Sequence, residues 1–299
     1  CTPQEAQDNQ FISNKIKALL SLKPDDQIYH EWFKRSIDAR KKKIKINCVF
    51  KVSTKEPIVE ENNINFPVLK TDKKVHIIGM GPAGMFAALY AIIHGYKPIV
   101  YERGKDVRER RRDLAKLNKE GIVNPESNYC FGEGGAGTYS DGKLYTRSKK
   151  RGDVREVLKL LVQFGADKNI LIDAHPHIGT NKLPQIISAI KEQITSSGGE
   201  IHFNHKLTDI KIGKEKVTQI TLNNEVLVPV SNLILATGHS ARDIYELLDS
   251  KGIKLLAKSF AIGVRIEHTQ EFIDMAQYGK LNDDFLPPAS YKLASQIDG

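Results

Sequence analysis

Residues 75–84 read Val-His-Ile-Ile-Gly-Met-Gly-Pro-Ala-Gly, an apolar run followed at once by a glycine-rich turn. The spacing of Gly79, Gly81 and Gly84 is the G-x-G-x-x-G pattern that joins a strand to a helix in dinucleotide-binding β-α-β units. Gly79 permits the tight turn, Gly81 lets the backbone approach a pyrophosphate, and Gly84 lets the helix pack closely on the strand. The turn therefore predicts a dinucleotide site.

The segments on either side of the turn support this interpretation. Pro82 and Ala83 open an apolar helix predicted over 82–94, whose first N–H groups would attract phosphate. A second strand is predicted at 99–101, and Glu102 follows it, where a carboxylate can accept hydrogen bonds from ribose hydroxyls. The β-α-β order implies parallel strands. A glycine-rich turn in an ordinary α/β fold is the alternative, and it does not account for the acid.

The first part of the chain predicts a separate small α+β domain. Apolar residues recur at helical spacing over 11–22, and a second helix is expected through Trp32 and Phe33. Apolar and polar residues alternate over 44–52, which is typical of a half-buried strand. We expect this N-terminal module to occupy residues 1–70.

The fold class predicted for the remainder is α/β, with a Rossmann-type three-layer domain over 71–245 and the beginning of an inserted substrate domain over 246–299. Helical spacing recurs at 154–164 and 183–194. Short strands are expected at 200–203, 206–212, 216–221, 225–228 and 233–236.

The elements around the turn favour FAD over NAD. Glu102-Arg103-Gly104 resembles the sequence that follows the second strand in glutathione-reductase-like flavoproteins, and Ala236-Thr237-Gly238 resembles the motif with which a later strand returns to the flavin there. The order of elements between them matches as well. By that resemblance, Leu207 lies near the adenine. Since the chain contains one G-x-G-x-x-G, NAD(P)H would approach the flavin transiently, or another reductant is used.

Residues 131–144 read Phe-Gly-Glu-Gly-Gly-Ala-Gly-Thr-Tyr-Ser-Asp-Gly-Lys-Leu, and we call them the glycine loop. Such a backbone can lie against a flat ring or a phosphate, and its N–H groups can form an anion-binding nest. A flexible surface loop is the alternative, against which the closely spaced polar residues and apolar flanks argue. The predicted cofactor contacts are Gly132, Glu133, Gly134, Gly135, Ala136, Gly137, Thr138, Ser140, Asp141 and Lys143.

Together with this loop, four other blocks carry a family resemblance over nearly the whole chain: residues 34–42, 175–180, 260–268 and 290–293. They resemble the uncharacterised FAD-dependent dehydrogenases of bacteria. The resemblance implies an FAD domain interrupted by a substrate domain, with an extra N-terminal module. Such proteins continue to a C-terminal glycine-aspartate motif that contacts FAD. This sequence reaches Gly299 soon after entering the presumed substrate domain, so we expect a truncated chain with an incomplete substrate site.

Few residues are candidates for chemistry, because a flavin would perform the hydride transfer and the protein would supply position and electrostatics. Lys143, or the N–H groups of 134–137, could stabilise an anionic reduced flavin, although Lys143 could equally pair with Asp141. Arg265 and His268 could orient an anionic substrate or serve as ordinary surface residues.

Cysteine and histidine add little to this set. Cys130 precedes the glycine loop without a partner cysteine, so we expect a buried structural thiol. His175 and His177 form an H-x-H pair that no set of Cys, Asp or Glu completes, so we expect no metal.

The composition is that of a globular protein, with 40% hydrophobic and 27% charged residues. No apolar run approaches the ~20 residues of a membrane span. Three cysteines without a C-x-x-C pair favour a reducing cytoplasm. Much of the net charge of +9 comes from residues 41–51 and 103–112. We interpret these as solvated surface near an anionic cofactor, with nucleic acid as the secondary interpretation.

The leading prediction is a cytoplasmic FAD-dependent oxidoreductase that acts on a small molecule. Two alternatives stay open. One is a flavoprotein that acts on RNA, such as a tRNA-modifying enzyme, and the other is a non-catalytic flavin-binding redox sensor. The substrate, the electron donor and the oligomeric state do not follow from the sequence.

Overall fold

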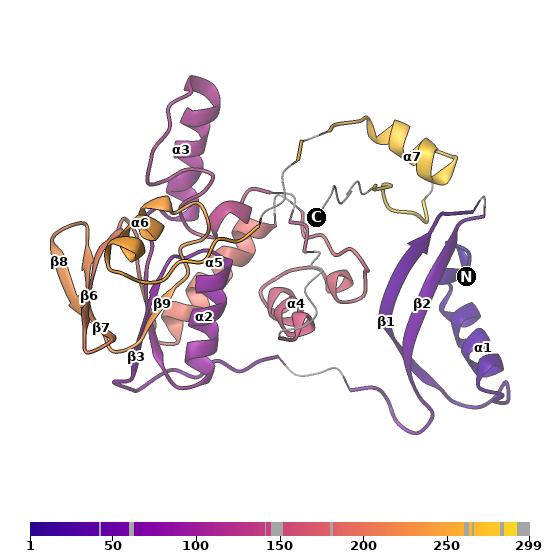
Figure 1. The fold of residues 1–299 in the computed structure, drawn as a ribbon. Coiled ribbons are helices and arrows are strands. Elements are labelled where there is room, and N and C mark those ends of the chain that lie inside the picture. Colours follow the sequence, from indigo (N-terminus) through magenta and orange to yellow (C-terminus); the bar gives the residue numbers. More distant parts are fainter. Residues whose placement is uncertain are drawn as a thin grey trace. The chain divides into compact units, whose positions relative to one another are not determined.

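The computed structural model describes residues 1–41, 43–59, 63–140, 142–144, 152–179, 182–259, 263–264, 266–281 and 284–291 of the 299-residue chain. Contacts divide the chain into two compact units (Figure 1). Unit 1 comprises Cys1–Asn62, Leu171–Pro176 and Ser259–Gly299, and unit 2 comprises Asn63–Ile170 and His177–Lys258. The domain boundaries drawn from the sequence stay a prediction.

A four-stranded parallel sheet of order β5-β4-β3-β9 forms the centre of unit 2. Its strands are β3 (Lys74–Ile78), β4 (Lys97–Tyr101), β5 (Glu200–His202) and β9 (Leu233–Leu235). Helix α2 (Pro82–Ile93) connects β3 to β4, and these two strands pair in parallel. The predicted β-α-β unit is therefore confirmed.

Helices cover one face of this sheet. Helix α2 packs with α5 (Leu183–Ser196) and α4 (Val154–Gln163) in one hydrophobic cluster. Ile77 of the sheet, Leu89 of α2 and Ile194 of α5 are fully buried in it. Burying a side chain of this size contributes about 1.5–3 kcal/mol, so the apolar spacing seen in the sequence holds this layer together.

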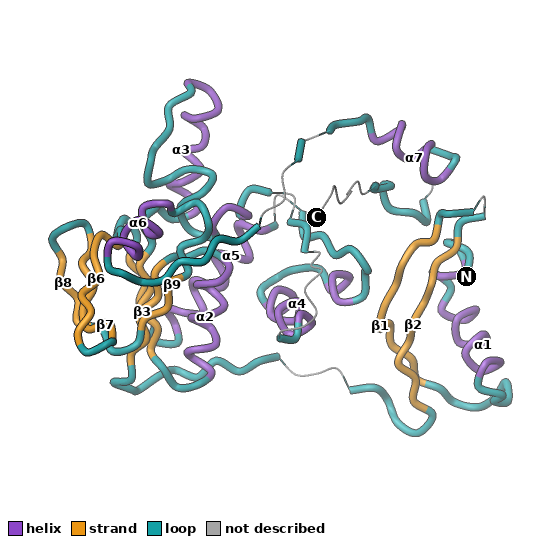
Figure 2. Tube along the Cα trace, viewed as in Figure 1, coloured by secondary structure: helices purple, strands orange, loops and turns teal. Residues whose placement is uncertain are grey.

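An antiparallel sheet covers the opposite face. It consists of β6 (Leu207–Gly213), β7 (Lys216–Leu222) and β8 (Val226–Pro229), and it packs with α6 (Arg242–Ser250). Successive strand residues point to opposite faces, so Ile77 faces the helices and Ile78 faces the antiparallel sheet. Figure 2 shows α2 and α5 on one side of β3, and β6 to β8 on the other. This arrangement confirms the predicted three-layer α/β fold.

Unit 1 is built on an antiparallel hairpin of β1 (Tyr29–Asp38) and β2 (Lys45–Ser53). Helix α1 (Asn9–Leu19) buries Ile12 and Ile16, and Ser13 Oγ lies 2.8 Å from His30 Nε2 on β1. Unit 1 also contains α7 (Gln270–Tyr278) and a 3₁₀ helix at Glu5–Gln7. In unit 2, the remaining elements are α3 (Val107–Glu120) and a 3₁₀ helix at Gly135–Gly137, and a third 3₁₀ helix, Lys168–Leu171, lies where the chain passes from unit 2 to unit 1.

The helix predicted through Trp32 and Phe33 is wrong, because both residues lie in β1. The Trp32 ring packs on Phe50 of β2, with 4.3 Å between ring centroids. Aromatic pairs of this kind across an antiparallel ladder stabilise strands. In a segment this short, the spacing of apolar residues fits a helix and a strand alike, and the pairing with β2 makes it a strand.

Within the described ranges, no helix combines the length and the apolar composition that crossing a membrane requires.

Candidate dinucleotide site

The turn after β3 lies directly against the turn after β9. Gly79 has a φ of +103°, and a Cβ built there would lie 2.4 Å from Ala236 O and 3.3 Å from Thr237 Cα. A Cβ on Gly84 would lie 1.9 Å from Gly79 O, because α2 packs on the turn itself. Both glycines are therefore required by packing, and the structure brings Ala236 and Thr237 to the glycine-rich turn.

Gly81 differs from these two glycines. Its backbone is extended, with φ −77° and ψ −176°, and a Cβ there would meet its nearest atom, Gly135 Cα, at an ordinary 3.7 Å. Pro82 and Ala83 are exposed at the start of α2, where the first N–H groups have no partner within the helix and carry partial positive charge. Packing within the protein does not require glycine at position 81. A ligand that approaches the backbone at this position would require it, because a side chain would lie in its way.

The Glu102 carboxylate ties the predicted site together. It is 5% exposed and accepts hydrogen bonds from three backbone N–H groups: Met80 at 2.7 Å, Gly104 at 2.9 Å and Gly132 at 3.0 Å. A carboxylate has about four acceptor positions, so about one is left for a ribose hydroxyl. Glu102 thus connects the turn after β3, the turn after β4 and the glycine loop.

The glycine loop lies against the start of α2. Gly134 N donates to Met80 O at 2.8 Å, and a Cβ on Gly135 would lie 3.0 Å from Gly81 Cα. Gly132, Gly134 and Gly135 have φ values of +117°, +81° and +67°, which side chains other than glycine rarely adopt. A Cβ on Gly104 would lie 2.6 Å from Gly132 N, so the turn after β4 packs on the loop equally closely.

The buried Arg110 of α3 was not predicted as part of the site. Its side chain is 0% exposed and donates five hydrogen bonds into residues 128–138. The acceptors are Asn128 O, Tyr129 O, Gly132 O, Glu133 O and Thr138 Oγ1. Burial lowers the pKa of this guanidinium, which nonetheless stays charged because arginine titrates far above neutral pH. Arg110 therefore holds the glycine loop in its bent conformation.

Two predicted cofactor contacts have side chains that point into the protein. Glu133 is 0% exposed and Thr138 is 1% exposed. One Glu133 oxygen accepts from Val107 N, the first residue of α3, at 2.7 Å and lies 3.2 Å from Lys191 Nζ. Burial raises the pKa of Glu133 although Val107 N and Lys191 act against it. As the structure stands, their contribution is to the shape of the loop.

Arg103 belongs to a four-charge network beside the antiparallel sheet. It donates to Glu126 at 2.6 Å and to Asp243 at 3.0 Å, and its guanidinium lies 4.2 Å from the Phe131 ring centroid. Lys206 pairs with the same two carboxylates, at 3.0 and 3.2 Å. Leu207, the next residue and the first of β6, is 3% exposed and belongs to the hydrophobic core between the two sheets. The network therefore fixes the region that the resemblance assigns to the adenine.

The other predicted residues lie at the surface or outside the described part. Ala136, Ser140 and Lys143 are exposed, as is Gly238. Lys143 forms an antiparallel bridge with His177. Asp141 and Arg265 lie outside the described residues. His268 belongs to unit 1, where its Nδ1 lies 2.8 Å from Tyr291 Oη.

Cys130 corrects one expectation, since the predicted buried thiol is exposed. The loop that precedes the glycines runs over the surface and turns its backbone, rather than this side chain, toward Arg110. In the part of the chain that the structure describes, no three His, Cys, Asp or Glu side chains group as metal ligands.

In the comparisons with known sequences, family models match two parts of the chain and a relative matches nearly all of it. Residues 1–53 match a domain of unknown function (DUF8436), and residues 259–299 match the model described as "FAD-dependent protein, C-terminal domain-like". A protein of Clostridium beijerinckii (strain ATCC 51743 / NCIMB 8052), named "Uncharacterized protein", is 40% identical over an alignment of 309 positions that covers 97% of this chain. The chain spans 58% of the length of that relative.

Solved structures that are similar to parts of the chain include the following three. Thermovibrio ammonificans THI4 is 18% identical with a TM-score of 0.40, over 61% of this chain and 64% of that one. Glycine oxidase from Bacillus cereus ATCC 14579 is 18% identical with a TM-score of 0.32, over 61% and 59%. CtdE in complex with FAD is 15% identical with a TM-score of 0.31, over 58% and 41%.

Proposed function

We propose that the protein binds FAD at the turn after β3 and acts as an oxidoreductase on a small molecule. One observation carries the proposal: Gly81 faces Gly135 at an exposed helix start although packing leaves room for a side chain there. A pyrophosphate approaching the backbone accounts for this glycine. The match of residues 259–299 to an FAD-dependent protein supports the same cofactor.

In this proposal the chain's own residues divide the binding between them. At the N-terminus of α2, the backbone N–H groups of Gly81 and Ala83 bind the pyrophosphate. Glu102 accepts from the ribose with its remaining acceptor position, and Leu207 supports the adenine. The N–H groups of 134–137, with Lys143, stabilise negative charge at the pyrimidine end of the flavin.

When bound, FAD supplies hydride or electron transfer. Arg110 and Glu133 act only through the loop whose backbone they hold. NAD(P)H as a transient electron donor is part of the proposal.

A matched pair of glycine variants tests the site. Gly81→Ala adds a methyl group that the fold accommodates, and Gly213→Ala adds the same group at the end of β6, where the nearest atom lies at a comparable 3.6 Å. We expect Gly213→Ala to bind FAD as the wild type does. Gly81→Ala should bind it about tenfold or more weakly, equivalent to about 1.4 kcal/mol, with an unchanged unfolding midpoint.

Flavin absorbance after purification, titration with added FAD and bleaching by dithionite are the measurements. Equal FAD affinity of the two variants would show that the pyrophosphate does not approach Gly81. A wild-type protein that neither retains nor binds FAD contradicts the cofactor itself. Oxidation of NADH and NADPH, followed separately, then identifies the donor.

A further inference from the structure

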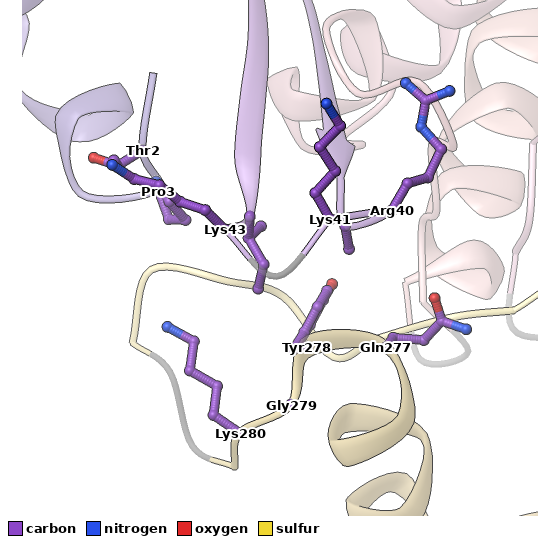
Figure 3. Close-up of a pocket in the computed structure, with 11 residues that line it drawn as sticks. Thr2, Pro3, Arg40, Lys41, Lys43, Gln277, Tyr278, Gly279 and Lys280 are labelled. Atoms are coloured by element: carbon purple, nitrogen blue, oxygen red, sulfur yellow. The ribbon is translucent and has the colours of Figure 1, made fainter.

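A cavity of about 640 Å³ lies within unit 1, beside the connection between β1 and β2. Its walls come from the N-terminal residues, from the β1–β2 connection and from the C-terminal end of α7, as Figure 3 shows. None of these segments takes part in the dinucleotide site. The residues used below are Thr2, Arg40, Lys41, Lys43, Tyr278 and Lys280.

The charged side chains that line the cavity are all positive. Arg40, Lys41, Lys43 and Lys280 line it, and no aspartate or glutamate is among its lining residues. Two carboxylates that contact lining residues are already engaged: Asp38 accepts two hydrogen bonds from the Arg40 guanidinium, at 2.9 and 2.7 Å, and Glu5 accepts one from Thr2 N at 2.8 Å. Asp38 thus neutralises and orients Arg40, which leaves the charge of Lys41 and Lys43 in excess.

The other wall supplies groups of a different kind. Helix α7 ends at Tyr278, and Gly279, with a φ of +69°, turns the chain so that Lys280 follows at the rim. A tyrosine ring offers both an apolar face and a hydroxyl. The combination of several lysines and an aromatic ring in the lining of one cavity suits a ligand with an anionic end and a planar or apolar body.

We propose that this cavity binds a small molecule that carries a phosphate group. Lysine is a common phosphate ligand as a compact point charge. A volume of about 640 Å³ falls within the 300–1,000 Å³ typical of small-molecule sites. A nucleic acid would instead need a basic stripe along the surface. The site is separate from the dinucleotide turn, so the proposal goes beyond FAD binding and does not depend on it.

ADP is the probe, measured by isothermal titration calorimetry in the presence of saturating FAD so that the dinucleotide site does not contribute. The test variant is Lys41→Gln/Lys43→Gln. The control is Lys34→Gln/Lys51→Gln, which removes the same charge from exposed positions of β1 and β2 outside the cavity. We expect ADP to bind the test variant about tenfold or more weakly than the control, and Lys280→Gln, on the opposite wall, to weaken it as well.

Three results would overturn the proposal: no ADP binding by the wild type, equal affinity of the test and control variants, or binding of an RNA oligonucleotide with none of ADP. Circular dichroism of each variant confirms that the hairpin is folded. If the wild type does not bind FAD, the comparison is repeated in the Gly81→Ala background, so failure of the flavin site and failure of this cavity give different results.

Discussion

The Arg110 guanidinium is fully buried among backbone oxygens of residues 128–133, which lead into and begin the glycine loop. Four of its five acceptors are backbone carbonyl groups, and the bonds to two of them, Gly132 O and Glu133 O, are buried. An unsatisfied buried acceptor costs about 1–3 kcal/mol. Arg110 therefore contributes more to the stability of the loop than an exposed arginine would.

Arg110→Met should therefore destabilise unit 2 by about 3–5 kcal/mol, since several carbonyls lose their donor at once. Methionine has a helix propensity close to that of arginine, so α3 itself is not penalised. Urea unfolding measures the change. Arg111→Met, at the exposed neighbouring position, should change the free energy of unfolding by no more than about 0.5 kcal/mol. Equal effects of the two substitutions would contradict the anchoring role.

Glu133 predicts a dependence of stability on pH. Burial raises the pKa of Glu133, so the folded state favours its protonated form. The stability contributed by that protonation is present below the ordinary glutamate pKa and is lost as pH rises through the folded value. Glu133→Gln should remove this loss. Relative to the variant, the wild type should therefore become less stable as pH rises from acid to neutral.

Glu126→Gln is the matched control with the opposite sign. Burial raises the pKa of Glu126, but hydrogen bonds and Coulomb attraction from Arg103 and Lys206 outweigh it and lower the pKa overall. The stability from this group is present above the ordinary glutamate pKa and is lost as pH falls. Urea unfolding over the acid range measures both, and parallel profiles for the two variants would refute the assignment.

At this scale the sequence predicted the residues whose role depends on local geometry. Gly84 meets Gly79 O, five residues before it, and Gly79 itself has a φ of +103° in the turn; the G-x-G-x-x-G spacing marks both positions, although it does not show that Gly79 also meets Ala236 after β9. Arg110 and Lys191 could not be predicted, because charged side chains are normally exposed and nothing local marks the ones that fold inward. The prediction for Cys130 is wrong for the opposite reason, because cysteine is usually buried and nothing local marks one that is exposed.

Among the elements, β1 carries a pairing that the sequence did not indicate. Arg35 N donates to Ile172 O at 2.6 Å, and Ala174 N donates to Arg35 O at 2.9 Å, so residues 172–174 run beside the strand. The Arg35 side chain adds contacts of 2.8 Å to Asp173. A segment from the middle of the chain therefore covers part of the outer edge of the hairpin.

Arg35→Met should loosen this segment. Both side chains of the ion pair are about one third exposed, at 36% and 35%, so solvent screening limits the loss to about 0.5–1 kcal/mol. Hydrogen exchange at the Ala174 amide should speed up accordingly, whereas Lys34→Met, at the exposed neighbour, should leave it unchanged. Unaltered exchange in Arg35→Met would mean that the backbone bonds alone hold the segment.

Elements with clear periodicity were predicted from the sequence, and the others were not. The strand at 75–78 and the helices at 154–164 and 183–194 correspond to β3, α4 and α5. Helix α3 buries only Val107, Arg110 and Leu114 in an otherwise charged sequence, so it has almost no apolar stripe to detect. The helix predicted where β1 lies is wrong because the aromatic residues of β1 gain their partners from β2, which local spacing does not show.

For the whole molecule, the three layers followed from the sequence because the β-α-β unit and the later strands imply them. The division into two units did not. It depends on residues 171–176 and 259–299, which join the first 62 residues although unit 2 lies between them in the chain. Periodicity reports which face of an element is buried, and it does not report which distant element buries that face.

This discontinuity has a practical consequence for anyone who cuts the molecule. The chain passes between the two units at 62/63, 170/171, 176/177 and 258/259. One proteolytic nick at any of these places leaves the halves covalently connected through the others. A fragment that ends at residue 62 would also lack the strand neighbour of Arg35 and expose an unpaired β edge, which invites self-association. The N-terminal unit is better obtained by deleting the intervening residues and joining its three pieces than by stopping the chain early.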